Sequence, residues 1–384
     1  MKRLRPNMQW VWQQPEFPAF HWDNAALQPL LSEARLLQGT LLGIAQTMES
    51  DIEQRLTEYA LTEELLTTSA IEGHILDRNS VRSSLANRLH LADAGFTTSQ
   101  DRYIEGLVDV VLNAIQETSM PLTLDMLCAW QAALFPTGYS GIRKVEVGQL
   151  RGEGDMEIIS GSPYKPKRHY LAPPCETLKA SMNDLLTWFN TTKIDGILKA
   201  GVAHLWFEIL HPFDDGNGRV GRTLIERALA QDEQLSVRYY SISQQIMSER
   251  KAYYAQLKLA STAGMDITHW LAWFIKTFSA AIRASLALVE ILTSKSHFWQ
   301  HHAQTLLNAR QIKVLNRMLD EGLNGFTGGM TTKKYGRLTK TSRATAYREI
   351  QDLVKKACLK PLPEKGRSSG YTICYPASKR TQKV

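Results

Sequence analysis

Apolar residues recur at helical spacing along two long stretches of this chain, and that period indicates a mostly α-helical fold. The first stretch covers residues 24–117 and includes the spacing of Leu61 and Leu65. The second covers residues 175–309. Between them, residues 136–174 are rich in glycine, proline and strand-forming side chains. We therefore expect a helical body interrupted by one β-hairpin.

The chain begins with an aromatic segment and has no long apolar run. Residues 8–22 alternate aromatic with other side chains and contain two prolines, which predicts a short extended arm pressed on the body. No stretch has the length of a signal peptide core or of a bilayer span. The four cysteines are far apart in the sequence, as isolated reduced thiols would be. These features predict a cytoplasmic protein without a zinc site.

Positive charge is concentrated in the last part of the chain. Residues 309–384 contain 17 Lys and Arg against 5 Asp and Glu, a net charge of +12. The rest of the chain contains 28 basic and 33 acidic residues, a net charge of −5. Since 384 residues exceed one ordinary domain, we expect two or three domains, with an anionic partner for the basic one.

A short segment, residues 211–222, combines turn-forming and reactive residues between two predicted helices. The first helix covers residues 198–210, and Pro212 forces His211 out of the helical conformation at its end. Residues 214–218 are rich in glycine, aspartate and asparagine, which tolerate positive φ and can turn backbone N–H groups inward. The next helix begins near Arg219 and adds its positive end to this nest.

The side chains of this segment suit chemistry at a phosphate. Arg219 and Arg222 can bind phosphate oxygens in a bidentate manner. Asp215 can hold Mg²⁺, or Mn²⁺, and His211 can accept a proton from an attacking hydroxyl. The alternative is a helix–turn–helix junction in which these residues only form the turn. A simple turn requires neither a histidine nor two arginines, so the set favours chemistry.

The segment resembles the signature of the Fic family, His-Pro-Phe-x-Asp-Gly-Asn-Gly-Arg-x-x-Arg, at every fixed position. The resemblance implies an α-helical core that binds ATP with Mg²⁺ and transfers AMP to Tyr, Thr or Ser hydroxyls of a target protein, and of the enzyme itself. It assigns His211 as general base and Asp215 to the metal. The phosphates would be bound by Asp215, Gly216, Asn217, Gly218, Arg219 and Arg222.

Similarity to the family extends over about residues 8–280. Tyr253 and Tyr254 resemble the pair that flanks the nucleotide base, with ordinary helix packing as the alternative. Some relatives carry at the position of Ser261 an asparagine that reaches the adenine, so the chain departs from the family there. Residues 156–174 resemble the flap that holds a target segment at a strand edge. The alternative is a plain surface hairpin.

A second motif precedes the signature. Thr68 and Glu72 share a helix face and Gly73 can end that helix. Taken alone, Glu72 would be a solvated side chain, but the segment matches the inhibitory motif of the family, (Ser/Thr)-x-x-x-Glu-(Gly/Asn). The resemblance implies that Glu72 pairs with Arg222 and inhibits transfer within the same chain. Relatives with this glutamate can also remove AMP from proteins (deAMPylation).

The basic terminal block has the element order of a winged helix. Helices are predicted at residues 311–321, 331–338 and 342–356, followed by strand-like runs within 360–375. On the last of these helices, Arg343, Tyr347 and Arg348 could face DNA. Contacts with protein, or packing of a homodimer, are the alternatives.

The sequence thus divides into six parts: an N-terminal arm and lead-in helix (1–50), a helical region with the inhibitory motif 68–73 (51–120), a Fic core with flap 156–174 and signature 211–222 (121–285), a linker helix (286–308), a winged helix (309–376) and a basic tail (377–384). Two further functions compete with AMP transfer. One is a DNA-binding regulator whose Fic core only senses nucleotides, and the other is a transferase that uses UTP or CDP-choline.

Overall fold

The protein forms two compact units. The structure, a computed structural model, describes residues 10–89, 101–160, 167–322, 329–362 and 370–375. The first unit comprises Met1–Thr47 and Gln54–Ala284, and the second comprises Met48–Glu53 and Ser285–Val384. None of the helices within the described ranges is long and apolar enough to cross a membrane.

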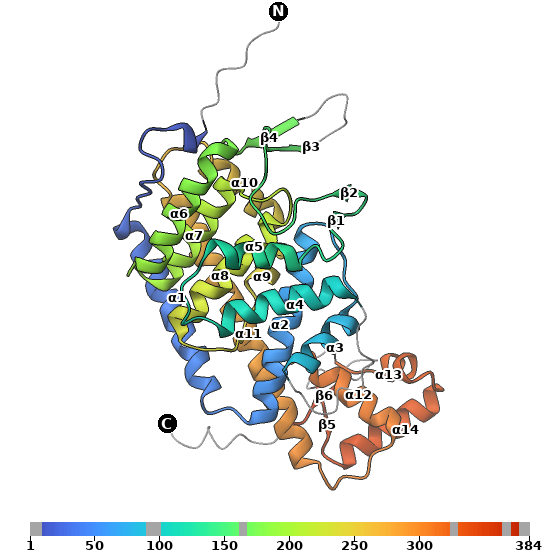
Figure 1. Cartoon of the computed structure of the whole chain (residues 1–384). Helices are drawn as coiled ribbons and strands as arrows, with labels where there is room; N and C mark the ends of the chain where they lie inside the picture. Colours follow the sequence, from blue (N-terminus) through green and yellow to red (C-terminus); the bar gives the residue numbers. More distant parts are fainter. Residues whose placement is uncertain (1–9, 90–100, 161–166, 323–328, 363–369, 376–384) are drawn as a thin grey trace, which may run out of the picture. The chain divides into compact units, whose positions relative to one another are not determined.

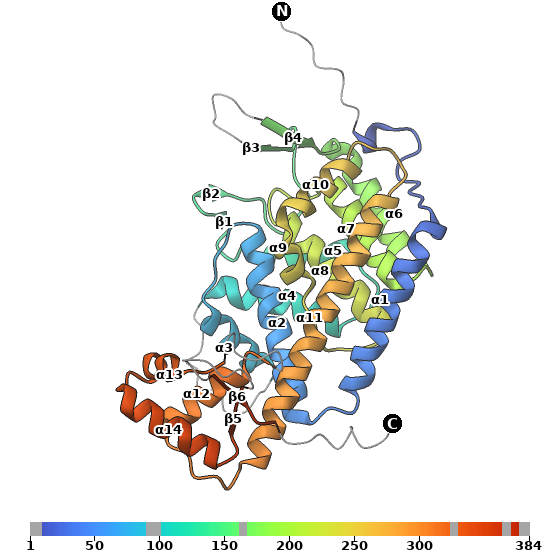
Figure 2. The same ribbon diagram turned by 180° about the vertical axis from the view of Figure 1, so that it is seen from behind.

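The first unit is mainly helical, as the apolar period predicts (Figures 1 and 2). Its helices are α1 (Asn24–Ala45), α2 (Ser50–Ile71), α3 (Arg78–Arg88), α4 (Arg102–Gln116), α5 (Leu124–Ala133), α6 (Cys175–Thr191), α7 (Gly196–Leu210), α8 (Asn217–Glu233), α9 (Ile242–Ser248), α10 (Arg250–Ala260) and the first half of α11 (Thr268–His301). Two small antiparallel hairpins complete it: β1 (Tyr139–Ser140) with β2 (Arg143–Lys144), and β3 (Glu157–Ser160) with β4 (Lys167–Leu171). The predicted single hairpin corresponds to β3–β4.

Helices α7 and α8 form the centre of this unit, since nearly all residues of α7 are buried. Figure 1 shows α4 and α5 on one face of the pair, and Figure 2 shows α11 on the other. Gly201 lets α11 approach α7, because a Cβ atom there would lie 2.9 Å from Cδ2 of Leu271. The indole of Trp270 also donates to the Gly201 carbonyl over 2.8 Å. The α7–α8 loop is therefore carried by the most buried part of the unit.

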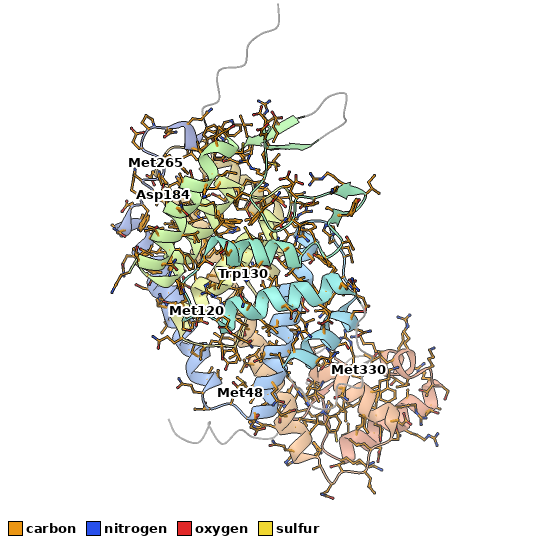
Figure 3. All side chains as sticks on the ribbon, in the orientation of Figure 1. Met48, Met120, Trp130, Asp184, Met265 and Met330 are labelled. Carbon is orange, nitrogen blue, oxygen red and sulfur yellow. The ribbon has the colours of Figure 1, made fainter. Side chains whose placement is uncertain are left out.

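Helices α4 and α5 pack through a second glycine. Gly106 of α4 faces the backbone of α5 so closely that a Cβ atom would lie 2.1 Å from the Ala133 carbonyl oxygen. Trp130, labelled in Figure 3, is buried on α5 and donates through Nε1 to Asn113 of α4 over 2.8 Å. The pair thus combines close backbone approach with a buried hydrogen bond.

A buried carboxylate anchors α2. Glu64 accepts hydrogen bonds from the Ser241 hydroxyl at 2.7 Å and from the Ser243 amide at 2.9 Å, and it also accepts one from the Ser243 hydroxyl. Glu64 is only 3% exposed, so water does not compete for these bonds. The helix that carries Thr68 is thereby held near Glu64, and Glu72 and Gly73 follow its last residue, Ile71, with a φ of 89° at Gly73.

The N-terminal arm is pressed on the body as predicted but is not a strand. Val11–Gln13 form one 3₁₀ turn, and the next backbone pairing to another segment is a single bridge between His21 and Asp266. Pro15 and Pro18 lack the N–H groups that a strand ladder needs. Trp10 and Val11 are nonetheless buried.

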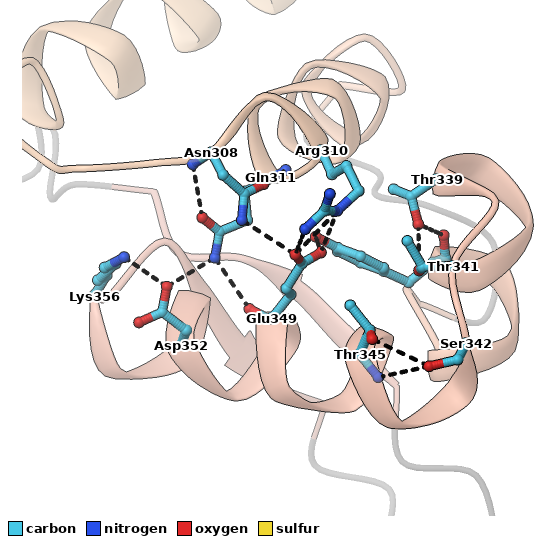
Figure 4. A network of polar contacts seen from close by, with 11 residues as sticks. Asn308, Arg310, Gln311, Thr339, Thr341, Ser342, Thr345, Glu349, Asp352 and Lys356 are labelled. Atoms are coloured by element: carbon cyan, nitrogen blue, oxygen red, sulfur yellow. Dashed lines mark hydrogen bonds and ion pairs between the residues drawn. The ribbon is translucent and has the colours of Figure 1, made fainter.

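The second unit contains the predicted order of three helices and a hairpin. These elements are α12 (Ala309–Leu319), α13 (Thr332–Thr339), α14 (Arg343–Lys355), β5 (Leu359–Pro361) and β6 (Tyr371–Ile373). Figure 4 shows that polar contacts converge on Glu349 of α14. Its carboxylate accepts from Arg310, from Asn308 at 3.1 Å and from the Tyr335 hydroxyl at 2.7 Å. One side chain therefore ties α14 to α12 and α13.

The predicted linker helix 286–308 is not a separate element. Its residues up to His301 continue α11, which runs unbroken from Thr268, and residues 302–308 are not helical. The reason is that the α11 sequence contains neither glycine nor proline, so nothing interrupts it at residue 285. The finer six-part division stays a prediction.

We expect Gly106→Ala to destabilise the first unit, because the new Cβ must displace the α5 backbone. Overpacking of this kind costs about 1–3 kcal/mol. The matched control is Gly39→Ala in α1, where no atom lies within 4 Å of the added Cβ. Alanine is the better helix former there and should stabilise by about 0.5–1 kcal/mol. Urea unfolding followed by circular dichroism measures both, and equal midpoints would contradict the close packing of α4 on α5.

Candidate active site

The loop between α7 and α8 has a fixed and unusual backbone. His211 ends α7 with a left-handed conformation, φ 48° and ψ 57°, as the following proline requires it to leave the helix. Asn217 closes the loop by accepting from the Phe213 amide at 2.9 Å and donating to its carbonyl at 2.7 Å. Gly216 has a φ of 90° and lies so close to Phe135 that a Cβ would be 2.9 Å from its ring. Only glycine suits this position.

Basic side chains hold the outside of the loop. Arg151 is buried, and it donates through Nε to the His211 carbonyl at 2.9 Å and through Nη2 to the Pro173 carbonyl. Arg143, which follows the β1–β2 turn, pairs with Asp214 at 2.8 Å. The loop is thus attached both to the segment after β4 and to the first hairpin.

The imidazole of His211 is neutral at ordinary pH. Burial is the largest cause that lowers its pKa to about 4, and the positive charge of Arg151 acts in the same direction. Its Nδ1 atom is buried and has no hydrogen-bond partner among the described residues, while Glu208 Oε2 lies 3.9 Å away. A neutral imidazole has a free lone pair, so His211 is in the protonation state that a general base needs.

Glu208 lies one turn before His211 on α7. Burial raises the pKa of its carboxyl to about 8, although Arg222 opposes this shift. Its Oε1 atom has no hydrogen-bond partner within the described ranges. Gly221 of α8 makes room for it, since a Cβ there would lie 2.8 Å from Oε1. A protonated, buried carboxyl therefore faces the candidate base.

Arg222 is held by the predicted inhibitory motif. Its Nε donates to the Thr68 hydroxyl at 2.9 Å, and its Nη2 donates to the Thr68 carbonyl at 2.9 Å and to Glu72 Oε1 at 2.8 Å. Arg222 is 1% exposed, and although burial opposes it, Glu72 keeps its pKa above the usual value. Gly218 leaves room for this carboxylate, because a Cβ there would lie 2.2 Å from Glu72 Oε1. The structure thus brings the motif at residues 68–73 onto the signature.

Arg222 and Arg219 both keep donors unused. Nη1 of Arg222 and Nε of Arg219 are buried without a hydrogen-bond partner in the described part of the chain. Arg219 is otherwise held by the Tyr103 hydroxyl at 3.0 Å and lies over the Phe135 ring at 4.9 Å. Unused guanidinium donors in a buried place are costly unless an anion satisfies them.

Asp215 is the one candidate metal ligand that the signature supplies. Its Oδ1 accepts from the Gly216 amide at 2.6 Å, and Arg219 lies 3.6 Å away. The described residues contain no cluster of three or more His, Cys, Asp or Glu side chains that could hold a metal. A single, partly exposed carboxylate suits Mg²⁺, which usually takes one or two carboxylates and fills its shell with phosphate oxygens and water.

A cavity of about 500 Å³ lies beside the loop. Its lining combines apolar and polar side chains from β3, β4, α7 and α10: Ile158, His169, Tyr170, Leu205, Glu208, Ile209, Arg250, Tyr254, Leu257, Lys258 and Ser261. Its volume is typical of small-ligand pockets. The Ser261 hydroxyl donates to the Lys258 carbonyl at 2.8 Å, so it is already engaged.

The two tyrosines of α10 differ in their surroundings. Tyr254 is 43% exposed and lines the cavity, as a residue beside a base would. Tyr253 is 1% exposed, stacks on His204 and bonds to its Nε2 atom at 2.9 Å. Tyr253 therefore has the core position of the packing alternative rather than a place in the cavity lining.

Two sequence models match the chain. Residues 121–229 match the Fic/DOC family, and residues 10–91 match a domain of unknown function, DUF4172. This chain carries a Fic/DOC domain. The match ends within α8 and includes the complete signature, residues 211–222.

Curated relatives resemble the Fic domain over part of their length. A probable protein adenylyltransferase of Aquifex aeolicus is 30% identical over 124 residues, which are 32% of this chain and 33% of that protein. A uridine 5'-monophosphate transferase of Xanthomonas campestris is 26% identical over 160 residues, 40% of this chain and 27% of that protein. The chain thus spans about a third or less of these relatives.

A solved structure shares the fold. A Fic family protein from Desulfovibrio desulfuricans superposes with a TM-score of 0.55 at 18% identity, and the match covers 94% of this chain and 99% of that one. The helical Fic-type fold with its small hairpin is therefore common to both proteins.

Sequence reasoning overlooked two residues beside the Fic signature. Glu208 could have been found, because a spacing of three residues on a helix puts it on the same face as His211. Arg151 gives no such signal, since its contact with His211 spans 60 residues of sequence. Arg343, Tyr347 and Arg348 belong to the second unit, where all three are exposed.

We expect Tyr253→Phe to lower the free energy of unfolding by about 1–3 kcal/mol, because the buried Nε2 atom of His204 loses its partner. Tyr254→Phe removes the same atom, whose bond to the Ile71 carbonyl is long, 3.4 Å. That control should stay within about 0.5 kcal/mol of the parent. Urea unfolding measures both, and equal losses would contradict different roles for the two tyrosines.

Proposed function

We propose that this protein is a protein adenylyltransferase, which transfers AMP from ATP to a Tyr, Thr or Ser hydroxyl of a target protein and of itself. The observation that carries the proposal is the α7–α8 loop of the Fic domain. A neutral His211 meets there, at the N-terminus of α8, with donors of Arg219 and Arg222 that have no hydrogen-bond partner among the described residues. A helix N-terminus with unpaired cationic donors suits phosphate, and a neutral imidazole suits a hydroxyl nucleophile.

The reaction is a displacement at the α-phosphorus of ATP. The acceptor oxygen forms a bond to that phosphorus, the bond to the β-phosphate bridging oxygen breaks, and pyrophosphate leaves. Because Nδ1 of His211 is buried towards Glu208, the Nε2 atom is assigned to take the hydroxyl proton. Arg219, Arg222 and the amides of residues 216–218 bind the phosphates. Mg²⁺ or Mn²⁺ held by Asp215 would neutralise phosphate charge.

The Xanthomonas relative is named for transfer of uridine 5'-monophosphate, so UTP is the competing donor. ATP, UTP and CDP-choline, each labelled at the phosphate next to the nucleoside, separate the alternatives. Label transferred only from ATP supports AMP transfer. Label only from another donor would overturn it, and no covalent label at all would favour a nucleotide sensor.

We further propose that Glu72 inhibits the transfer in the intact chain. Glu72 occupies Nη2 of Arg222, a donor that would otherwise serve the last phosphate of ATP. The Glu72 side chain is 30% exposed, whereas Arg222 is buried. The carboxylate can therefore leave while the guanidinium stays in place. Whether the same glutamate aligns water for deAMPylation is tested by release of AMP from a purified modified target.

We expect Glu72→Gln to raise incorporation of labelled AMP by about tenfold, since one charge-assisted bond is worth about 1.5–3 kcal/mol and 1.4 kcal/mol is a factor of ten. Glu72→Gly should raise it at least as much. The added change His211→Ala should abolish incorporation in every background.

Glu58→Gln is the matched control, because Glu58 lies on α2, the helix that Glu72 follows, and pairs with Arg82 at 2.7 Å, away from the motif. It should leave incorporation unchanged. Equal incorporation by intact and Glu72→Gln protein would remove the inhibitory role from the proposal. Mass spectrometry of the product identifies the acceptor residue.

A second candidate function concerns the second unit, which we propose is a winged helix that binds DNA. The observation that favours it is that α14 uses some of its side chains for contacts within the unit and leaves others exposed. Its polar contacts converge on Glu349 and Asp352 towards α12 (Figure 4), whereas Arg343, Tyr347 and Arg348 are exposed. Further positive charge comes from α13 and the turn before α14, where Lys333, Arg337 and Lys340 are exposed. Such a surface suits phosphates. A homodimer stays a prediction.

We expect a gel shift of random duplex DNA at low salt that is lost steeply as salt is added. Arg348→Ala should weaken binding and reduce the slope of log K against log salt by about 1. Lys313→Ala removes the same charge from an exposed site on α12 and should have less effect. No shift at low salt would favour a protein partner instead.

A further inference from the structure

The first residues of the described chain join two walls of the cavity. Trp10, Val11 and Trp12, here called the N-terminal clasp, form the beginning of the 3₁₀ turn. One wall of the cavity is β4, which contributes His169 and Tyr170, and the other is the end of α10, which contributes Lys258 and Ser261. The clasp contacts both walls.

The contact with β4 has a polar and an aromatic part. The indole Nε1 of Trp12 donates to the Leu171 carbonyl at 2.8 Å. The Trp10 ring packs edge-on against Tyr170, with 5.1 Å between ring centroids. Tyr170 in turn donates to the Ile209 carbonyl at 2.5 Å, which connects it to α7 just before His211. The position of β4 over the cavity is thus set from two sides.

The contact with α10 is a backbone hydrogen bond. The Val11 amide donates to the Ser261 carbonyl at 2.8 Å, and Ser261 ends α10. Trp10 is 4% exposed and Val11 is completely buried, so this bond is shielded from water. Leu171 and Ser261 are 90 positions apart in the sequence, and the clasp holds both within three consecutive residues.

We propose that the N-terminal clasp is a positioning element for the donor nucleotide, because it sets the distance between β4 and α10 and so the width of the cavity that takes the base. This inference rests on the proposed function. The base would lie between the apolar side chains of the lining, such as Ile158 and Leu257, with Arg250 and Glu208 available at its edges. A cavity wall that moves outward loses contact with a flat ring and binds it less tightly.

The clasp also gives a role to the region that matches a domain of unknown function. That match begins at Trp10 and includes Glu72. Its start would therefore position the base, and Glu72, 62 residues later, would compete for the arginine at the other end of the same nucleotide. In this proposal the matched region acts at both ends of the donor nucleotide, at the base and at the phosphates.

The test compares donor binding with turnover in the full chain carrying Glu72→Gly. Trp12→Phe keeps an aromatic ring but removes the indole N–H. Val11→Pro removes the amide that bonds to Ser261, and proline is tolerated at the first position of a helical turn after a residue as extended as Trp10, with ψ 150°. Each variant should raise KM for ATP about two- to tenfold, with kcat within about twofold, since one hydrogen bond is worth about 0.5–1.5 kcal/mol.

The control is Trp22→Phe, which removes an indole bond to Asn24 Oδ1 of similar length, 2.9 Å, at a residue that does not line the cavity. It should leave KM and kcat unchanged. If Trp12→Phe and Val11→Pro both match this control in KM, or lower kcat alone, the clasp does not position the donor. A parent that transfers no AMP would instead overturn the proposed function. In that case the Kd of ATP–Mg²⁺, measured by calorimetry, tests the clasp directly: a rise of the same size supports it and an unchanged Kd rejects it.

Discussion

The two hydrogen bonds between the Asn217 side chain and the backbone of Phe213 close the loop on which the whole site depends. They hold a left-handed His211 at one end and the first turn of α8 at the other. The loop can keep this shape because α7 and α8 are buried on nearly all sides, so neither helix can shift to relieve it. Among the described residues, the site also contains buried donors without partners, such as Nη1 of Arg222. Unpaired donors of this kind are what the proposed phosphate binding would satisfy.

Local signals in the sequence were sufficient for much of the fold. Helix ends at Ser342 and at Gly73 follow from capping chemistry, and the structure has the Ser342 cap and the positive φ of Gly73. The pairing of Glu72 with Arg222 came from a motif and not from spacing, because these residues are 150 positions apart. Long-range contacts without a motif could not be predicted. Examples are Trp12 with Leu171, 159 positions apart, and Arg219 with Tyr103, 116 positions apart.

Where the structure departs from a simple sequence pattern, the physical reason is identifiable. The alternation of residues 8–22 resembled a strand, yet two prolines left it without a ladder, and the burial of Trp10 and Val11 comes from packing instead. The linker helix 286–308 is not a separate element, because α11 contains no breaking residue and runs unbroken from Thr268 to His301. Tyr253 and Tyr254 are adjacent in sequence but have different surroundings, because successive residues on a helix point about 100° apart.

The anchoring of α2 by Glu64 limits how the contact between Glu72 and Arg222, proposed to be inhibitory, can change. Glu64 bonds to Ser241 and Ser243 two turns before Glu72, and these bonds do not involve Arg222. Because Glu72 follows Ile71, the last residue of α2, its side chain can rearrange while α2 stays docked. Because both partners of the ion pair are in one polypeptide, dilution does not weaken it. If Glu72 inhibits transfer as proposed, a releasing signal would have to break one partly exposed ion pair between described residues, so modest binding free energy from a partner would be enough.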